Sequence, residues 1–172
     1  MTAKSRLSWR LGPRTVPLDD YRIMLCNTLE AVTPVAEWDP RIGIAHLEEM
    51  SETEQRIALD RWFAEVEQRV SCLTAQIARM SQIHPPDASL MGLHSAVVAL
   101  GEDYAGCVGK RVDALKCAGT DDEKSLECKK KALHHRAHLS TDGEHLAEQI
   151  ANLRRTCPEL LAQLNLHERY SA

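Results

Sequence analysis

The chain has 172 residues, of which 44% are hydrophobic and only 4% are aromatic, and its formal net charge is −4. This length and composition are typical of one globular domain with an aliphatic core, and they exclude a disordered chain. The negative net charge argues against bulk attraction to nucleic acid, and no apolar run approaches the roughly 18 residues of a transmembrane helix.

The first 16 residues are a basic arm that contains no acidic residue. Its cations and its single tryptophan are Lys4, Arg6, Trp9, Arg10 and Arg14. No apolar segment of the secretory type follows these charges, so the arm is interpreted either as an uncleaved segment that binds a partner or as a mitochondrial-type targeting sequence. Residues 17–172 are predicted to form a single helical domain.

Helix start and stop signals divide this domain into six predicted helices. Pro17 opens the first helix, and Ser51, Thr120 and Thr141 each begin a capping-box pattern, in which a hydroxyl and a carboxylate satisfy free N–H groups at a helix start. The predicted ranges are 17–33, 40–49, 52–83, 88–117, 121–139 and 142–166. No segment shows the alternation of an amphipathic strand.

Three of these helices carry apolar residues at alternating spacings of three and four. Such seams are buried against partner helices with coiled-coil-like packing. The sequence therefore predicts an all-α fold, an antiparallel bundle of four to six helices that includes a helical hairpin over residues 88–139. The three seams consist of Leu59, Phe63, Val66, Val70, Leu73, Ile77 and Met80; of Leu90, Leu93, Val97, Leu100, Tyr104 and Cys107; and of Leu146, Ile150, Leu153, Cys157, Leu160 and Leu164.

Three cysteines mark the predicted hairpin. Cys107, Cys117 and Cys128 enclose gaps of nine and ten residues, and the second gap contains a turn signal around Gly119. Folding the chain back so that Cys117 faces Cys128 places Cys107 opposite His138. The hairpin then has one candidate disulfide rung and an outer rung in which one cysteine is replaced. The alternative is that all six cysteines are small buried hydrophobic side chains.

This cysteine pattern resembles the coiled-coil-helix-coiled-coil-helix family, in which two helices joined by a short turn each carry two cysteines that bracket nine residues. Cys107 and Cys117 match the first pair, Cys128 matches the third position, and His138 stands at the fourth. The resemblance covers about 35 of the 172 residues. It implies a Cys117–Cys128 disulfide and leaves Cys107 without its partner. It also implies a small protein of the mitochondrial intermembrane space, where many family members are assembly factors or accessory subunits of respiratory complexes.

A histidine group in the same region is a candidate metal site. His134, His135 and His138 lie close together in the sequence. His134 and His138 are four residues apart and share one helix face, a spacing at which two imidazoles can bind zinc or copper. No His-Glu-x-x-His or Glu-x-x-His pattern is present, which excludes the metalloprotease and di-iron bundle patterns. The adjacent Lys129, Lys130 and Lys131 disfavour a cation, so a solvated basic face is preferred.

Charge is distributed unevenly along the chain. Residues 37–67 contain nine acids against three arginines, and residues 110–138 contain eight cations against five acids. The favoured interpretation is that helices of one bundle attract each other. The alternative is a basic face for an acidic partner or for anionic lipid, with Lys129, Lys130 and Lys131 as the contacts.

The sequence gives no support for catalysis or for a bound cofactor, since it lacks a nucleophile elbow, a phosphate loop and a dinucleotide fingerprint. We expect a non-catalytic accessory subunit of a larger protein assembly, such as a mitochondrial respiratory complex, on its intermembrane-space side or in a membrane-associated assembly. The alternative is a free-standing cytoplasmic interaction module of the adaptor, chaperone or immunity type. A third hypothesis is a metal or redox protein using Cys107, Cys128, His134, His135 and His138.

Overall fold

The computed structural model of this chain describes residues 14–32, 44–117 and 123–166. It confirms the all-α fold, since five α-helices account for most of the described residues. The helices are α1 (Leu18–Ala31), α3 (Glu52–Met80), α4 (Met91–Lys116), α5 (Glu123–Thr156) and α6 (Pro158–Leu164). Two short 3₁₀ helices, η2 (Leu47–Glu49) and η3 (Ala88–Leu90), and two paired two-residue strands, β1 (Arg14–Thr15) and β2 (Ile83–His84), complete the described elements.

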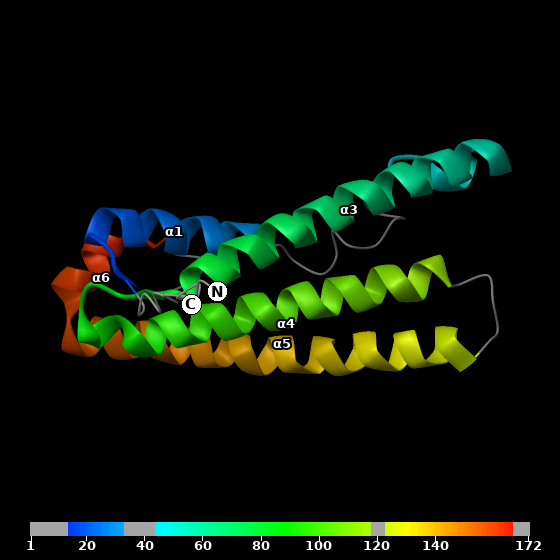
Figure 1. Cartoon of the computed structure of the whole chain (residues 1–172). Coiled ribbons are helices and arrows are strands. Elements are labelled where there is room, and N and C mark those ends of the chain that lie inside the picture. The colour runs from blue at the N-terminus through cyan, green and yellow to red at the C-terminus, as the bar shows by residue number, and fades with distance from the viewer. Residues whose placement is uncertain (1–13, 33–43, 118–122, 167–172) are drawn as a thin grey trace, which may run out of the picture.

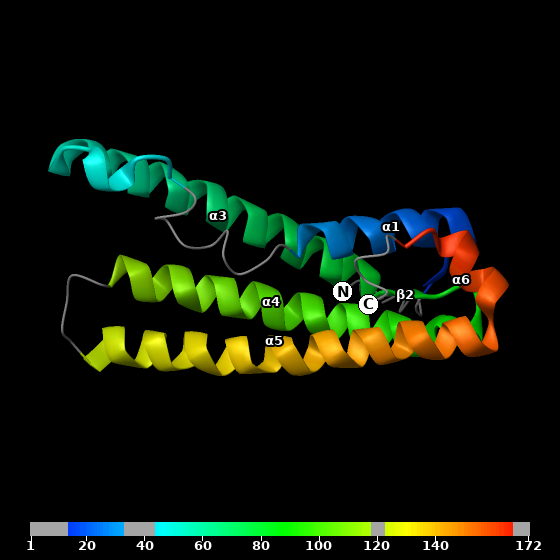
Figure 2. The ribbon, with the colours of Figure 1, turned by 180° about the vertical axis from the view of Figure 1, so that it is seen from behind.

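The long helix α4 lies in the middle of the molecule. Figure 1 shows α5 antiparallel to α4 along its whole length and α3 on the opposite side of α4, and Figure 2 shows the same order from behind. Helix α1 packs beside the C-terminal half of α3, and α6 turns back at the end of α5. The N-terminal end of α3 diverges from α4 and extends past it.

The predicted seams form the core of the bundle. Every residue of the α4 seam, from Leu90 to Cys107, is buried. In α3 the seam residues Val66, Leu73, Ile77 and Met80 are buried, and α5 contributes its own seam residues from Leu146 to Leu153. The apolar stripes of three helices therefore meet as the heptad spacing predicts, with α4 contributing to both hydrophobic clusters.

The start of α3 confirms one capping box. The Ser51 hydroxyl accepts a hydrogen bond from the Glu54 backbone N–H, and the Glu54 carboxylate accepts from the Ser51 N–H at 2.9 Å. These bonds satisfy N–H groups that have no partner inside the helix. The Ser51 hydroxyl also donates to the Glu54 carboxylate at 2.6 Å, and this bond, followed by the Ser51 N–H bond, lowers the pKa of Glu54 because both favour its charged form.

Of the other two predicted capping boxes, the one at Thr120 lies outside the described residues, and the one at Thr141 does not begin a helix. Residues 123–156 form one continuous helix, so the expected helices 121–139 and 142–166 are wrong in their division. Asp142 lies inside α5, where its carboxyl group is turned toward Asp103 of α4, and Gly143 is tolerated at a cost of about 1 kcal/mol. The true break comes at Pro158, because proline has no N–H group to continue the helix.

The expected helix 40–49 is also wrong in its described part. Within residues 44–49, only the 3₁₀ turn Leu47–Glu49 is helical. His46 has a φ of 57°, in the left-handed region, and such a residue interrupts a right-handed helix. Residues 40–43 lie outside the described residues.

Candidate functional site: a polar cluster between α4 and α5

Contacts along the α4–α5 hairpin define its register. The Cys107 sulfur lies 3.9 Å from the Ala132 carbonyl oxygen, and Gly106 lies against the His135 ring. Further along, Gly92 lies against Gln149. These facing pairs are centred near position 120, where the sequence has its turn signal.

The expected cysteine rungs are therefore wrong. Cys107 lies opposite Ala132 and not opposite His138, and the same register places Cys128 level with Val112 rather than with Cys117. No disulfide is present in the described part of the chain, which includes all six cysteines. The prediction failed because it centred the hairpin on the cysteines, whereas the facing pairs of α4 and α5 are centred near position 120.

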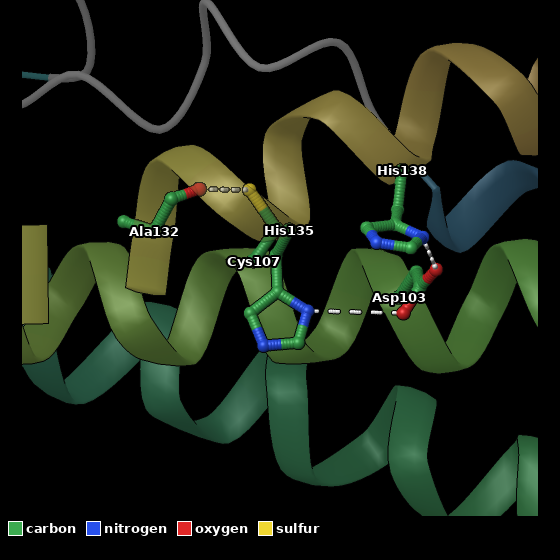
Figure 3. A network of polar contacts seen from close by, with 5 residues as sticks. All are labelled: Asp103, Cys107, Ala132, His135 and His138. Atoms are coloured by element: carbon green, nitrogen blue, oxygen red, sulfur yellow. Dashed lines mark hydrogen bonds and ion pairs between the residues drawn. The ribbon is translucent and has the colours of Figure 1, made fainter. Parts of the chain in front are cut away.

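The Cys107 thiol behaves as a small buried side chain. It is 5% exposed and is directed at the Ala132 carbonyl (Figure 3). Burial raises its pKa, an effect that the nearby Arg136 and Arg111 partly offset and that Asp103 reinforces. The thiol thus stays protonated and is not an activated nucleophile.

Asp103 is the centre of a polar cluster that joins the two helices. Its two carboxylate oxygens each lie 3.7 Å from an imidazole, Oδ1 from His135 Nδ1 and Oδ2 from His138 Nδ1 (Figure 3). These distances exceed those of hydrogen bonds, so the contacts are electrostatic and require protonated histidines for their full strength. Gly106 makes room for this arrangement, because a Cβ there would lie 3.1 Å from His135 Cε1.

Asp142 adds a second carboxyl group to the cluster. Burial is the main cause that raises its pKa, and a hydrogen bond to Asp103 and repulsion from that carboxylate raise it further. The neighbouring His138 and His145 offset part of this effect. The Asp142 Oδ2 atom is buried and has no hydrogen-bond partner among the described residues. The raised pKa therefore favours the protonated form of Asp142 beside Asp103 more than in an isolated aspartate.

The three histidines lie close together, but they do not form the ligand arrangement of a metal site. The His134 and His138 rings are in edge contact at 4.6 Å between centroids, and His135 and His138 both turn toward Asp103. Among residues 14–32, 44–117 and 123–166, no three His, Cys, Asp or Glu side chains are arranged to hold a metal ion. The cluster instead places two imidazoles of α5 beside one carboxylate of α4.

The basic residues that we singled out have different surroundings. Lys4, Arg6, Trp9 and Arg10 lie outside the described residues. Arg14 is in β1, where its backbone N–H donates to the Gln82 carbonyl at 3.2 Å. Lys129 and Lys130 are exposed on α5, and Lys131 is in an ion pair with Glu127.

Sequence reasoning missed the surface leucines beside these lysines. Leu126 is 53% exposed and Leu133 is 65% exposed, although both belong to a helix that packs on α4. The available sequence signal for this exposed face was that the two leucines lie seven residues apart and outside the predicted seam of the helix.

At the start of α3, a groove of about 500 Å³ lies between Ile44, Met50 and Trp62, beside the exposed Ile57.

Comparisons of the chain with protein-family models, with curated proteins and with solved structures found no match. The resemblance to the coiled-coil-helix-coiled-coil-helix family stays a prediction. Within the described residues, no helix has both the length and the apolar character needed to cross a membrane.

Proposed function

We propose that this chain is a non-catalytic helical subunit of a larger protein assembly. The observation that supports this role is the outer face of α5, where Leu126 and Leu133 are more than half exposed on a helix whose other side is fully packed against α4. Large apolar side chains that repeat on one helix face are stabilised when a further helix covers them.

The polar cluster supports a structural role rather than a chemical one. The Cys107 thiol points at a carbonyl group and not at an imidazole, and both histidines that contact Asp103 share the same carboxylate. These contacts hold two helices in one register. Cys117 and Cys128 do not face each other, so the disulfide that the family resemblance implies for an intermembrane-space protein is not formed between α4 and α5.

The mass of the particle that contains this chain in an extract of its native source tests the proposal. We expect a particle well above the 19.3 kDa of the single chain. Leu133→Glu should release the chain from that particle, because a charge replaces a covered apolar contact, and the change leaves the fold intact at a position that is 65% exposed. A native particle with the mass of one chain would contradict the proposal.

A further inference from the structure

The outer side of α5 carries a short stripe of residues that faces away from the bundle. Leu126, Lys130, Leu133 and Ala137 follow one another at spacings of four, three and four, as in a coiled-coil seam, and we call these four residues the outer stripe. All four are exposed, the two leucines by 53% and 65%. Helix α4 packs on the opposite side of α5, where Ala132 is buried, so the outer stripe has room for a further helix.

Cations surround the outer stripe. Lys130 lies within it, and Lys129 and Arg136 lie on one of its flanks. In the part of the chain that the structure describes, none of these three cations is in an ion pair, whereas Glu127 on the other flank is paired with Lys131. The outer stripe therefore presents net positive charge to its surroundings.

The acids of α5 do not offset these cations along the stripe. Residues 126–141 contain four cations and one acid, Glu127, while Glu123 and Glu144 stand before and after this segment. Helix α4 adds a further cation, Lys110, beside Glu127. The field along the outer stripe is thus basic, although the chain as a whole has a net charge of −4.

The bundle itself does not bring an acidic helix to this side of α5. We expected the acidic and basic segments of the chain to attract each other, and between them the described residues show the Lys116–Glu67 ion pair, which joins α4 to α3. Figures 1 and 2 show α4 between α3 and α5, so α3 lies on the other side of the molecule from the outer stripe. The exposed Arg61 also interrupts the acids at the start of α3, so a second copy of this chain offers no uniformly acidic face there.

The outer stripe fits a helix better than it fits a lipid surface. Binding of an amphipathic helix to lipid increases with the apolar area that it buries, and such helices often present Trp, Phe and Leu along one whole face. Between residues 126 and 141 there is no Phe, Trp or Tyr, and the outer stripe has two large apolar side chains. Two leucines seven residues apart instead match the repeat of a single neighbouring helix.

We propose that an acidic amphipathic helix of a different protein binds along the outer stripe as a third helix beside α4 and α5. Its apolar side chains cover Leu126 and Leu133, and the small Ala137 allows a close approach of the two backbones. Its carboxylates pair with Lys130 in the seam and with the cations on the flank. Lys130 selects for such a partner, because an ammonium group that is covered by an apolar or basic helix is left without a counter-charge. The inference rests on the proposed function and names the chemistry of the subunit that it requires.

Photo-cross-linking in the native particle identifies the segment that covers α5. Benzoylphenylalanine is incorporated in place of Ser140, which is exposed and continues the seam three residues after Ala137, in the full-length chain expressed in its native source. After irradiation, mass spectrometry identifies the peptide that is joined to this position. We expect a peptide of another protein that has apolar residues at heptad spacing and more Asp and Glu than Lys and Arg.

Charge reversal in the full-length chain tests the role of the cations. Lys130→Glu should reduce the fraction of the chain that remains in the native particle by at least about tenfold, because attraction becomes repulsion. Lys124→Glu is the matched control, since it makes the same charge change on an exposed position of the same helix, about 120° around the axis from Lys130. Its retained fraction should stay within about twofold of the wild type. Replacing acids of the cross-linked segment with lysine should restore the binding of Lys130→Glu, and circular dichroism checks that each variant keeps its helices.

Several results would overturn the proposed acidic partner. They are a cross-link to a second copy of this chain, to a lipid or to a segment without net negative charge, the absence of any cross-link in the particle, and equal retention of Lys130→Glu and Lys124→Glu. In each of these cases the proposed function still stands if the native particle exceeds the mass of one chain. A native particle with the mass of one chain overturns both.

Discussion

Replacing Gly101 with alanine tests how closely α4 approaches α3. A Cβ at Gly101 would lie 2.9 Å from both Cδ1 and Cγ1 of Ile77, with Thr28 Cγ2 3.9 Å away. Carbon atoms in contact prefer about 3.5–4.0 Å, so the Ile77 side chain or its helix must move. The glycine therefore permits a helix approach that any side chain would oppose.

Two opposing effects determine how much Gly101→Ala changes the free energy of unfolding. Alanine favours the helix by about 1 kcal/mol over glycine, and overpacking of a buried contact costs about 1–3 kcal/mol. We expect Gly101→Ala to lower the free energy of unfolding by about 1 kcal/mol, or the melting temperature by about 3 °C for a chain of this size. Gly109→Ala is the matched control on the same helix, because a Cβ there would have no described side chain or other element within 4 Å. It should stabilise by up to about 1 kcal/mol.

Urea denaturation measures both free energies under one set of conditions. A double-mutant cycle with Ile77→Ala assigns the cause, since removal of the two opposing carbons should make the double variant more stable than the sum of the single effects by about 1 kcal/mol. Equal stability of Gly101→Ala and Gly109→Ala, or strict additivity in the cycle, would refute the close packing of Gly101 on Ile77.

Three further predictions concern the titrating groups and the thiols. The raised pKa of Asp142 means that stability is lost as pH rises through this pKa. Asp142→Asn, whose amide donates to Asp103 without ionising, should therefore raise the melting temperature at pH 7, and a lower melting temperature in a thermal scan at pH 7 would contradict this. Burial lowers the pKa of His94, so its contribution is present above about pH 6.5 and lost as pH falls below that value, and His94→Gln should flatten the decline of melting temperature between pH 7 and 5. Unreduced peptide mass spectrometry should find no disulfide, and Cys72, which is exposed, should alkylate at least about tenfold faster than the buried Cys107; equal rates would argue against the packing of α4 on α5.

Much of the fold was predictable because heptad spacing and capping residues act locally. The Ser51 box begins α3 within one residue of the expected position, and the seam from Leu90 to Cys107 is buried throughout. The same local signals misplaced a helix start at Thr141, where Asp142 contacts a carboxylate on α4 instead of capping its own helix. That choice depends on a tertiary contact that the spacing of residues does not reveal.

The candidate site was predicted less well than the fold, because its geometry depends on the register of the hairpin. The sequence singled out His135 and His138 as a candidate metal group, whereas their neighbour Asp103 lies on the other helix and belongs to no local motif. Centring the hairpin on Gly119 would have brought Asp103 near these histidines, whereas centring it on the cysteines brought His138 to Cys107. The exposure of Leu126 and Leu133 could not be predicted without knowing that α4 packs on the opposite face of α5.

Side-chain oxidation by hydroxyl radicals tests most directly whether another subunit covers Leu126 and Leu133 on the outer face of α5. The chain is labelled in its native particle and again after isolation at a concentration where it is monomeric. We predict that Leu126 and Leu133 lose most of their labelling in the particle, while the exposed Met91 of α4 serves as the reference. Equal labelling of both leucines in the two states would contradict the account.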